Sequence, residues 1–304
     1  MSEALMELSN ALAAATEQAA AHIVAVHTGP RGSSSGVIWR AGLVVTAEHA
    51  LRSDEEIRVT LPDQRVVSAT LAGRDSTTDL AVLKCAEAVR PVAGFGDPSR
   101  LTAGHTALVI GRTRASGPVA ALGMVSLAVA ERKQWGGATL SPYIRLDVGL
   151  QPTAIGGAVV DPHGKVVGIA TPKFARFGAI AIPVATVNRV ADTLLSKGHV
   201  PRGYLGVGLQ PVRLPVEFLQ SAQRNGKTAT IVLDVAANGP AHKSGLLVGD
   251  LLLSLDGNEV HHPGDVHSAL GPDSIGKTVV AQLLRGGELR ELRIVVIERP
   301  NGVK

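Results

Sequence analysis

Three features in the first half of the chain have residue types that together suit acyl transfer. They are His49, Asp79 and the glycine-containing loop 150–159, and they follow one another in that order. Acyl transfer by a catalytic triad needs a base within hydrogen-bonding reach of a nucleophile, and a carboxylate that fixes the tautomer of that base. The order therefore indicates a hydrolase site of the triad type, with the loop as the expected source of the nucleophile.

The residues around His49 and around Asp79 resemble motifs of the HtrA family of trypsin-like serine proteases. Residues 44–50 (VVTAEHA) resemble the motif of the catalytic histidine, and residues 77–84 (TTDLAVLK) match the motif of the catalytic aspartate nearly letter for letter. Three shorter stretches also agree with the family, namely 123–126 (GMVS), 146–148 (LDV) and 179–183 (AIAIP). The resemblance implies that His49 occupies the position of the base and Asp79 that of the orienting carboxylate.

The loop 150–159 reads LQPTAIGGAV and resembles the family's nucleophile loop, which normally reads PGNSGGPL. Its glycine pair and the apolar residues after it are in place. Ile155, however, stands at the position of the catalytic serine, and Thr153 at that of the glycine whose N–H contributes to the oxyanion hole. Because an isoleucine side chain has no oxygen to attack a carbonyl, the resemblance implies a degenerate, proteolytically inactive member.

An active endopeptidase with a non-standard nucleophile is the alternative. The hydroxyl of Thr153 would project differently from that of a serine two residues later, and Ser126 and Ser141 are expected in strands elsewhere. A replacement nucleophile must reach the same point within about an ångström to keep its rate. Threonine also tolerates positive φ poorly, so we expect a collapsed oxyanion hole. An engineered inactivation would explain Ile155, but alanine is the usual choice and Thr153 would stay unexplained.

Short strands are the elements that must position these residues. From Ile23 onward, β-rich segments follow one another, separated by Gly, Pro, Asp and Asn. They cover residues 23–26, 36–39, 43–46, 57–61, 66–71, 107–110, 123–130, 143–146, 158–160, 166–170 and 180–182. This rhythm indicates an all-β barrel or sandwich, and the resemblance implies a chymotrypsin-like double β-barrel. A helix over 183–196, stopped by Gly198, closes the region.

The N-terminal segment is predicted to be a helix over residues 2–21. Leu5, Leu8 and Leu12 lie on one side of it at helical spacing. In the HtrA family this segment contributes to trimer contacts, so the resemblance implies a homo-oligomer, specifically a trimer. An ordinary helix that packs on its own domain is the alternative.

The C-terminal third has a different pattern and resembles a PDZ domain of the HtrA type. The resemblance rests on residues 203–208 (GYLGVG), 239–246 (GPAHKSGL) and 249–257 (GDLLLSLDG). Strands are expected over 205–210, 229–235, 250–255, 278–285 and 288–296, with helices over 215–224 and 264–270. The predicted fold class is mainly β: a double β-barrel followed by a small α+β PDZ domain. The expected domains are an N-terminal helix (1–22), a degenerate protease domain (23–198), a linker (199–203) and the PDZ domain (204–300).

A PDZ domain of this kind binds peptides by strand addition, with the C-terminal carboxylate held by successive backbone N–H groups. The resemblance places the carboxylate loop at Tyr204, Leu205, Gly206 and Val207, and the receiving edge at residues 205–210. Val266 or Leu270, in the predicted helix, would form the other wall and favour an apolar terminal residue. A PDZ fold that serves only for packing or regulation is the alternative.

Composition excludes several other classes of function. The net charge of +4 is spread without a basic run, so we expect no nucleic-acid partner. The single cysteine, Cys85, forms neither an internal disulfide nor a cysteine-rich zinc site. His261, His262 and His267 lie close together but lack further ligands, so we expect neither a metal nor a cofactor.

The N-terminus lacks a basic segment followed by a continuous apolar run, and the most apolar window, residues 117–130, is too short for a membrane span. The sequence therefore predicts a cytoplasmic protein with no membrane span, whereas the family resemblance implies a periplasmic one. The function that the sequence favours is that of a proteolytically inactive HtrA homologue. Such a protein would bind unfolded or C-terminal peptide segments as a scaffold, chaperone or regulator of an active homologue.

Overall fold

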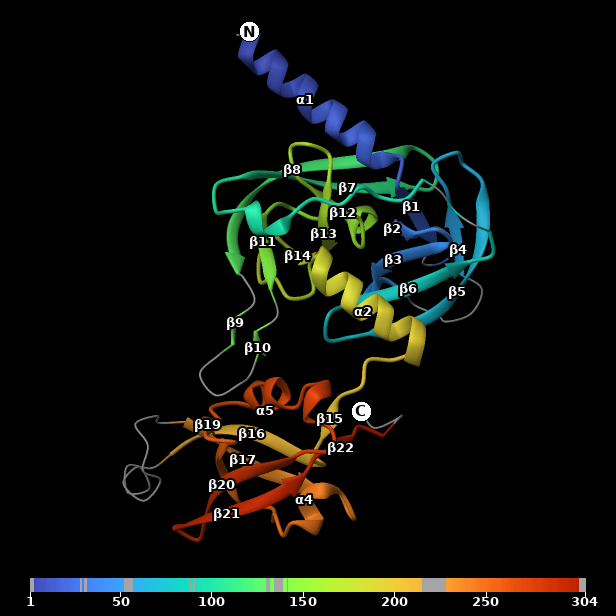
Figure 1. Ribbon diagram of the computed structural model, residues 1–304. Coiled ribbons are helices and arrows are strands. Elements are labelled where there is room, and N and C mark those ends of the chain that lie inside the picture. The colour runs from blue at the N-terminus through green and yellow to red at the C-terminus, as the bar shows by residue number, and fades with distance from the viewer. Residues whose placement is uncertain are drawn as a thin grey trace. The chain divides into compact units, whose positions relative to one another are not determined.

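A computed structural model of the chain describes residues 3–27, 29, 32–51, 57–87, 89, 91–129, 132–133, 139–140, 142–214 and 228–300 (Figure 1). The chain divides into two compact units. The first unit, called the protease unit after the family that its motifs resemble, comprises Met1–Ala130 and Ser141–Val200. The second unit comprises Glu131–Leu140 and Pro201–Lys304.

The first barrel of the protease unit is closed by six antiparallel strands in the order β1-β2-β3-β6-β5-β4. Their bounds are β1 Ile23–His27, β2 Ser33–Arg40, β3 Leu43–Ala47, β4 Ile57–Thr60, β5 Val66–Asp75 and β6 Leu80–Cys85. Val26, Val44 and Leu83 are among the β-branched and leucine side chains that fill its interior. Because one face of each strand is buried, the register is strongly specified, and this fixes the ends of β3 and β6 next to each other.

The second barrel has the strand order β11-β14-β13-β12-β7-β8 and closes through the pair β8 and β11. Its strands are β7 Thr106–Thr113, β8 Gly117–Val129, β11 Tyr143–Asp147, β12 Ala158–Val160, β13 Val166–Thr171 and β14 Ala179–Pro183. The strand predicted over 123–130 is therefore the second half of a longer strand. Its first half was missed because Gly117, Pro118 and several alanines give that part a weak β signal.

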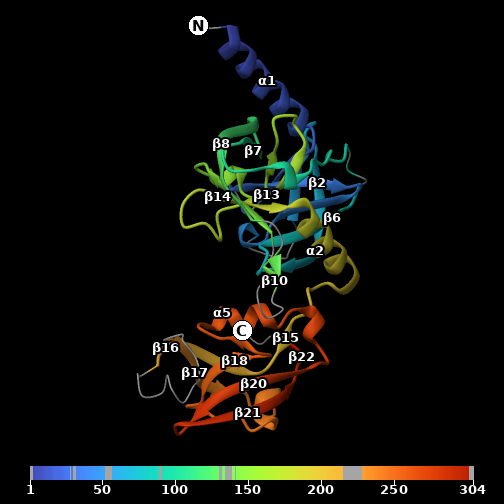
Figure 2. The ribbon, with the colours of Figure 1, turned by 60° about the vertical axis from the view of Figure 1, so that its left-hand side comes forward.

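Two helices flank the barrels. α2 (Val184–Lys197) packs its buried face against the core between the barrels, and Gly198 ends it in the left-handed conformation (φ 76°), as predicted. α1 (Glu3–Ala20) buries only Ala15, Ala19 and Ala20 near its end. Its first half extends away from the barrels, as two views of the ribbon agree (Figures 1 and 2).

The second unit is built on one sheet with the strand order β16-β17-β18-β20-β21, in which β19 pairs with β18. A short pair of strands, β15 and β22, lies beside it, and β9 pairs with β10. The bounds are β9 Arg132–Lys133, β10 Thr139–Leu140, β15 Gly203–Tyr204, β16 Val207–Arg213, β17 Thr228–Val235, α4 Pro240–Lys243, β18 Leu251–Leu255, β19 Asn258–Glu259, α5 Pro263–Ala269, β20 Thr278–Arg285, β21 Glu288–Val295 and β22 Ile297–Glu298. The helix predicted over 215–224 lies outside the described residues.

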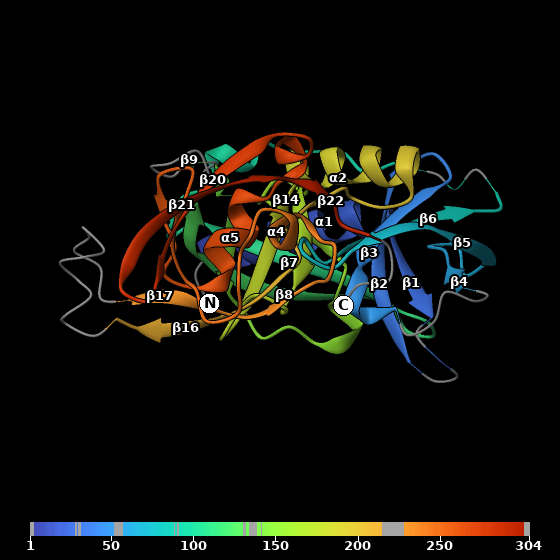
Figure 3. The same ribbon diagram turned by 90° about the horizontal axis from the view of Figure 1, so that it is seen from below.

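Among the described strands, β16 is the edge strand of this sheet, and it pairs with β17 (Figure 3). It begins at Val207, two residues later than the predicted edge over 205–210. The prediction was wrong at its start because Gly206 adopts φ +77°, which interrupts the extended backbone. Together with the two barrels, this smaller sheet with its helices confirms the predicted mainly β fold class. In the part of the chain that is described, no helix is long and apolar enough to span a membrane.

Candidate functional site

The orienting group of the candidate catalytic site is Asp79, which lies in the turn between β5 and β6. Its side chain is fully buried, and its backbone has φ +57°, which is rare for a residue with a Cβ. The turn is held by Asp75, whose carboxylate accepts hydrogen bonds from the N–H and hydroxyl groups of Thr78. This local cage explains how the chain holds Asp79 in a conformation that strand and helix propensities alone do not favour.

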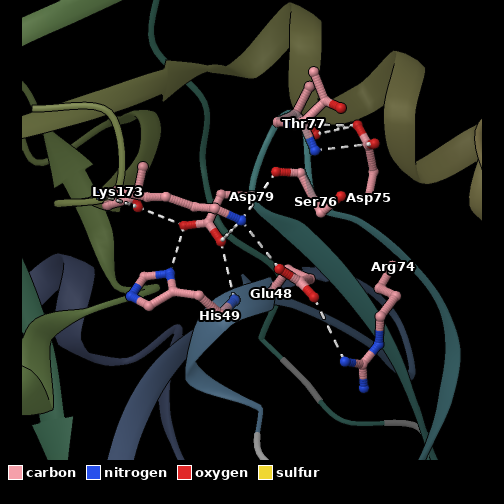
Figure 4. Close-up of polar contacts among 10 residues, drawn as sticks. Glu48, His49, Arg74, Asp75, Ser76, Thr77, Asp79 and Lys173 are labelled. Carbon is pink, nitrogen blue, oxygen red and sulfur yellow. Dashed lines mark hydrogen bonds and ion pairs between the residues drawn. The ribbon is translucent and has the colours of Figure 1, made fainter. Parts of the chain in front are cut away.

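His49 belongs to a short 3-10 turn, Glu48–Ala50, that directly follows β3. Its Nδ1 lies 2.7 Å from Oδ2 of Asp79, and its backbone N–H donates to Oδ1 of the same carboxylate at 2.9 Å (Figure 4). A carboxylate accepts hydrogen bonds, so Nδ1 carries the proton and Nε2 is left as the acceptor. This is the tautomer that a triad base requires.

Two further side chains hold the Asp79 carboxylate. The hydroxyl of Thr171, at the end of β13, donates to Oδ2, and the Lys173 ammonium lies 3.6 Å from Oδ1. Lys173 also donates to Glu48 at 3.2 Å and to the carbonyl of Ser76 at 2.9 Å (Figure 4). The buried carboxylate is thus paired and hydrogen-bonded, as a buried charge must be to persist. Sequence analysis missed Thr171 and Lys173, which are about 90 residues from Asp79 in the chain and reach it only through barrel closure.

The loop that carries Ile155 forms a 3-10 turn, η3 (Pro152–Ala154), between the barrels. Ser35 on β2 anchors it twice: the Ser35 N–H donates to the carbonyl of Ile155 at 2.8 Å, and its hydroxyl donates to that of Thr153 at 2.6 Å. Gly156, the next residue, packs so closely on the end of β3 that an added Cβ would lie 2.7 Å from the Ala47 nitrogen. The loop therefore sits against the strand whose continuation carries His49.

The side chain of Ile155 is half buried, and its backbone N–H donates to the carbonyl of Pro152 at 3.3 Å. Thr153 lies within η3 and does not have a positive φ. Ser126 lies in β8, whereas Ser141 is outside the described residues. The geometry thus brings together a base and an orienting carboxylate, next to a loop that supplies an aliphatic side chain and turns the Ile155 N–H toward its own backbone.

A second candidate site, a cavity of about 400 Å³, lies in the second unit between β16 and α5. It is lined by all six residues expected there: Tyr204, Leu205, Gly206, Val207, Val266 and Leu270. Among the described residues, the N–H groups of Leu205 and Gly206 have no hydrogen-bond acceptor. Adjacent N–H groups of this kind can receive an anion such as a carboxylate.

Two arginines, Arg202 and Arg299, also line this cavity and add positive charge to it. Sequence analysis missed both. Arg202 directly precedes the GYLGVG motif, whereas Arg299 follows β22 and comes close because β22 pairs with β15. Val266 and Leu270 give the cavity an apolar wall, which suits an apolar side chain of a ligand.

The remaining sequence candidates have structural surroundings. Burial raises the pKa of the Cys85 thiol to about 11, so Cys85 is an unreactive thiol at neutral pH. His262 is the N-cap of α5, in a capping box with Asp265, and His261 lies 3.3 Å from the Glu259 carboxylate. No cluster of three or more potential metal ligands occurs within the described residues.

Family comparisons assign both units. Residues 34–169 match the family model of the trypsin-like peptidase domain, and residues 203–296 match that of the PDZ domain. A probable periplasmic serine endoprotease, DegP-like, of Halomonas elongata is 32% identical over 280 residues, which cover 90% of this chain and 58% of the relative. The chain thus spans somewhat more than half the length of the curated relatives it matches. Their names place these relatives in the periplasm, so the expectation of a cytoplasmic protein finds no support.

Solved structures of HtrA-type proteases are similar over nearly the whole chain. One is the protease AlgW with a decapeptide, with a TM-score of 0.74 and 28% identity, covering 95% of this chain and 98% of that one. Another is AlgW with a tripeptide, with a TM-score of 0.72 and 31% identity, covering 95% and 97%. The chain therefore belongs to the HtrA family, whose trypsin-like protease domain is followed by a PDZ domain.

Proposed function

We propose that this protein is an HtrA pseudoprotease that binds peptide C-termini in the cavity between β16 and α5 and does not cleave them. The observation that carries the proposal is Ile155. It stands where the family's motif has the nucleophilic serine, beside an otherwise complete pair of His49 and Asp79. A base without a hydroxyl to deprotonate has no step to perform in acyl transfer.

The backbone of the same loop supports this proposal. Stabilising the tetrahedral intermediate needs N–H groups that point at the developing oxyanion. Here the N–H of Ile155 donates a hydrogen bond to the carbonyl of Pro152, and Thr153 replaces the glycine of the family motif. Both changes support an inert site, because acyl transfer uses a nucleophile and is accelerated by an oxyanion hole.

The direct test is cleavage of an unfolded protein substrate by the wild type and by His49→Ala. We expect no cleavage by either protein above the background of a mock purification. The competing function is an endopeptidase with a hidden nucleophile that uses the old base. It predicts cleavage by the wild type that disappears in His49→Ala, and that outcome would reject the pseudoprotease.

Peptide binding is the activity that we propose in place of cleavage. The cavity combines two adjacent N–H groups without acceptors, two arginines and an apolar wall. AlgW has been solved with bound peptides, which supports peptide binding here by family likeness. An extended peptide would pair with the free edge of β16 and place its carboxylate at Leu205 and Gly206.

A titration with paired peptides tests the groove. An apolar-ended decapeptide with a free C-terminus is compared by calorimetry with the same peptide amidated at that end. Because amidation removes the charge that the N–H groups hold, we expect affinity to fall about tenfold or more. Equal affinities, or no binding of the free-acid peptide, would reject carboxylate recognition and leave the second unit a packing or regulatory domain.

We also propose that the protein assembles through α1, as a trimer by family likeness. Leu5 and Leu8 are 58% and 52% exposed on the half of α1 that extends from the barrels. Such an exposed apolar stripe suits burial against other copies, including an active homologue in a mixed assembly. Leu5→Glu with Leu8→Glu is expected to give a monomer by native mass spectrometry. A wild type that is monomeric at micromolar concentration would contradict the assembly.

A further inference from the structure

A cavity of about 830 Å³ lies on the outside of the second barrel, in the protease unit. Its floor includes Arg145, Ile180 and Ile182, from β11 and β14. Their neighbours Ile144, Ala179 and Ala181 point inward and belong to the barrel core. Neither His49 and Asp79 nor the loop 149–155 lines the cavity, but Thr77 and Thr78, from the turn that carries Asp79, do.

Aromatic side chains are concentrated at this cavity. The chain has two tryptophans, two tyrosines and four phenylalanines, and among the described ones Tyr143, Phe174 and Phe177 line the cavity. Phe174 and Phe177 belong to the loop between β13 and β14, and they are 51% and 80% exposed. Because exposed aromatic groups beside an apolar cavity usually mark a binding surface, their position needs an explanation beyond packing.

Positive charge lies beside the same aromatic rings. Arg176 lies 5.7 Å from the ring centre of Phe177. The Lys173 ammonium lies 5.9 Å from that of Phe174, but its charge is compensated by Glu48 and Asp79. Arg145 lines the floor, and Asp147 is the one acidic residue among the described residues that line the cavity. Within the described chain, neither Arg145 nor Arg176 forms an ion pair with a carboxylate. The cationic rim therefore favours an apolar ligand that carries negative charge next to its apolar part.

We propose that this cavity is a second peptide site, which takes an aromatic side chain from an internal segment of an unfolded polypeptide with acidic flanking residues. Its volume falls within the range of cavities that enclose small ligands, about 300–1,000 Å³, so one aromatic side chain fits. The site goes beyond the proposed carboxylate groove, because it needs no free C-terminus. A polypeptide bound at both sites would gain avidity without cleavage.

The probe is an acetylated and amidated nonapeptide with a central phenylalanine between two glutamates, which the carboxylate groove is not expected to hold. Its binding to the full chain is measured by fluorescence anisotropy. We expect Phe174→Ser with Phe177→Ser to weaken binding about tenfold or more, since each removes an aromatic contact. Arg176→Glu should weaken it further, and replacing the two glutamates of the peptide by lysines should weaken binding to the wild type.

The matched control is Val66→Ser, which removes an equally exposed apolar side chain (55%) from β5, away from the cavity. It is expected to bind the probe like the wild type. A free-acid apolar peptide, titrated in parallel, reports on the groove of the second unit. Urea denaturation of each variant shows that the unit carrying the substitution is folded. Absent binding of the amidated probe, or binding that the phenylalanine variants leave unchanged, would overturn the second site even if the groove binds normally.

Discussion

The candidate site of the protease unit and the groove of the second unit differ in what their chemistry depends on. Proteolysis at the first would depend on a side-chain oxygen at position 155, where this chain has isoleucine. Peptide binding at the second would depend on the backbone N–H groups of Leu205 and Gly206. A backbone donor is present in every residue except proline, but a nucleophilic oxygen is present in few. A single substitution can therefore end catalysis, while a groove built from backbone groups tolerates changes of side chain.

The polar network around Asp79 is retained although we propose that the site does not react. A buried carboxylate cannot be left without partners, so its hydrogen bonds are needed for stability whether or not the site reacts. Selection for folding alone is enough to preserve such a network. An intact pair of His49 and Asp79 is consequently weak support for proteolysis, and the state of the loop at Ile155 carries more weight.

Restoring the nucleophile gives the largest expected effect and would break the contrast between the two sites. We expect Thr153→Gly with Ile155→Ser to cleave an unfolded protein at least about 10³-fold faster than the wild type. Ile155→Ser alone should cleave about 10²-fold more slowly than the double variant, because losing one properly directed oxyanion donor costs about that much in rate. Cleavage is followed by gel and mass spectrometry. Adding His49→Ala to the double variant serves as the control and should remove the gain.

Removing the Asp79 side chain tests whether the hydrogen-bond network of His49 and Asp79 stabilises the fold. Asp79→Ala leaves two N–H groups of His49 and the hydroxyl of Thr171 without their acceptor, and should lower the free energy of unfolding by about 3 kcal/mol. Urea denaturation measures the loss. Asp192→Ala, which removes an exposed carboxylate paired with Arg40, is the control and should cost less than about 1 kcal/mol. Peptide affinity of the groove should be unchanged, and a large change in that affinity would argue against two independent sites.

A change of backbone should affect the groove where a change of side chain would not. Gly206 has φ +77°, and a Cβ there would lie 3.1 Å from the Ala236 Cβ. An alanine at this positive φ would be strained by about 1–3 kcal/mol, and relief of that strain would move the N–H donors. Gly206→Ala should therefore reduce the affinity for a free-acid peptide about tenfold. Gly245→Ala is the matched control: it has φ +82° but no neighbour within 4 Å and does not line the cavity. Equal losses in both variants would indicate general destabilisation.

The smallest expected effect concerns pH and the protease unit alone. Burial lowers the pKa of His27 below 6.5, and the charges of Arg114 and Arg58 lower it further. The unfolded chain then takes up the proton first, so stability should decline as pH falls through 6.5 toward the lower pKa of the folded state. The decline should be slight, because His27 is partly exposed to solvent. His27→Gln should flatten the dependence between pH 7 and 5 in urea unfolding, while peptide affinity stays constant.

The sequence predicted the fold class because strand patterns and family motifs extend over most of the chain. It predicted less well where a local signal was weak or a neighbour was distant. The first half of β8 was missed. The start of β16 was placed two residues early, because the residue type of Gly206 does not reveal its backbone conformation. Boundaries of this kind depend on backbone angles that the folded surroundings select.

The residues available for chemistry were determined by the sequence alone. No folding places an oxygen on Ile155, and His49, Asp79 and the groove residues stand in motifs short enough to recognise locally. Tertiary structure decided which distant residues join them. Lys173 reaches Asp79, Arg299 reaches the groove, and three aromatic rings meet at one cavity, because barrel closure and strand pairing bring together segments far apart in the chain. Such contacts depend on the register of buried strands, which one segment read alone does not contain.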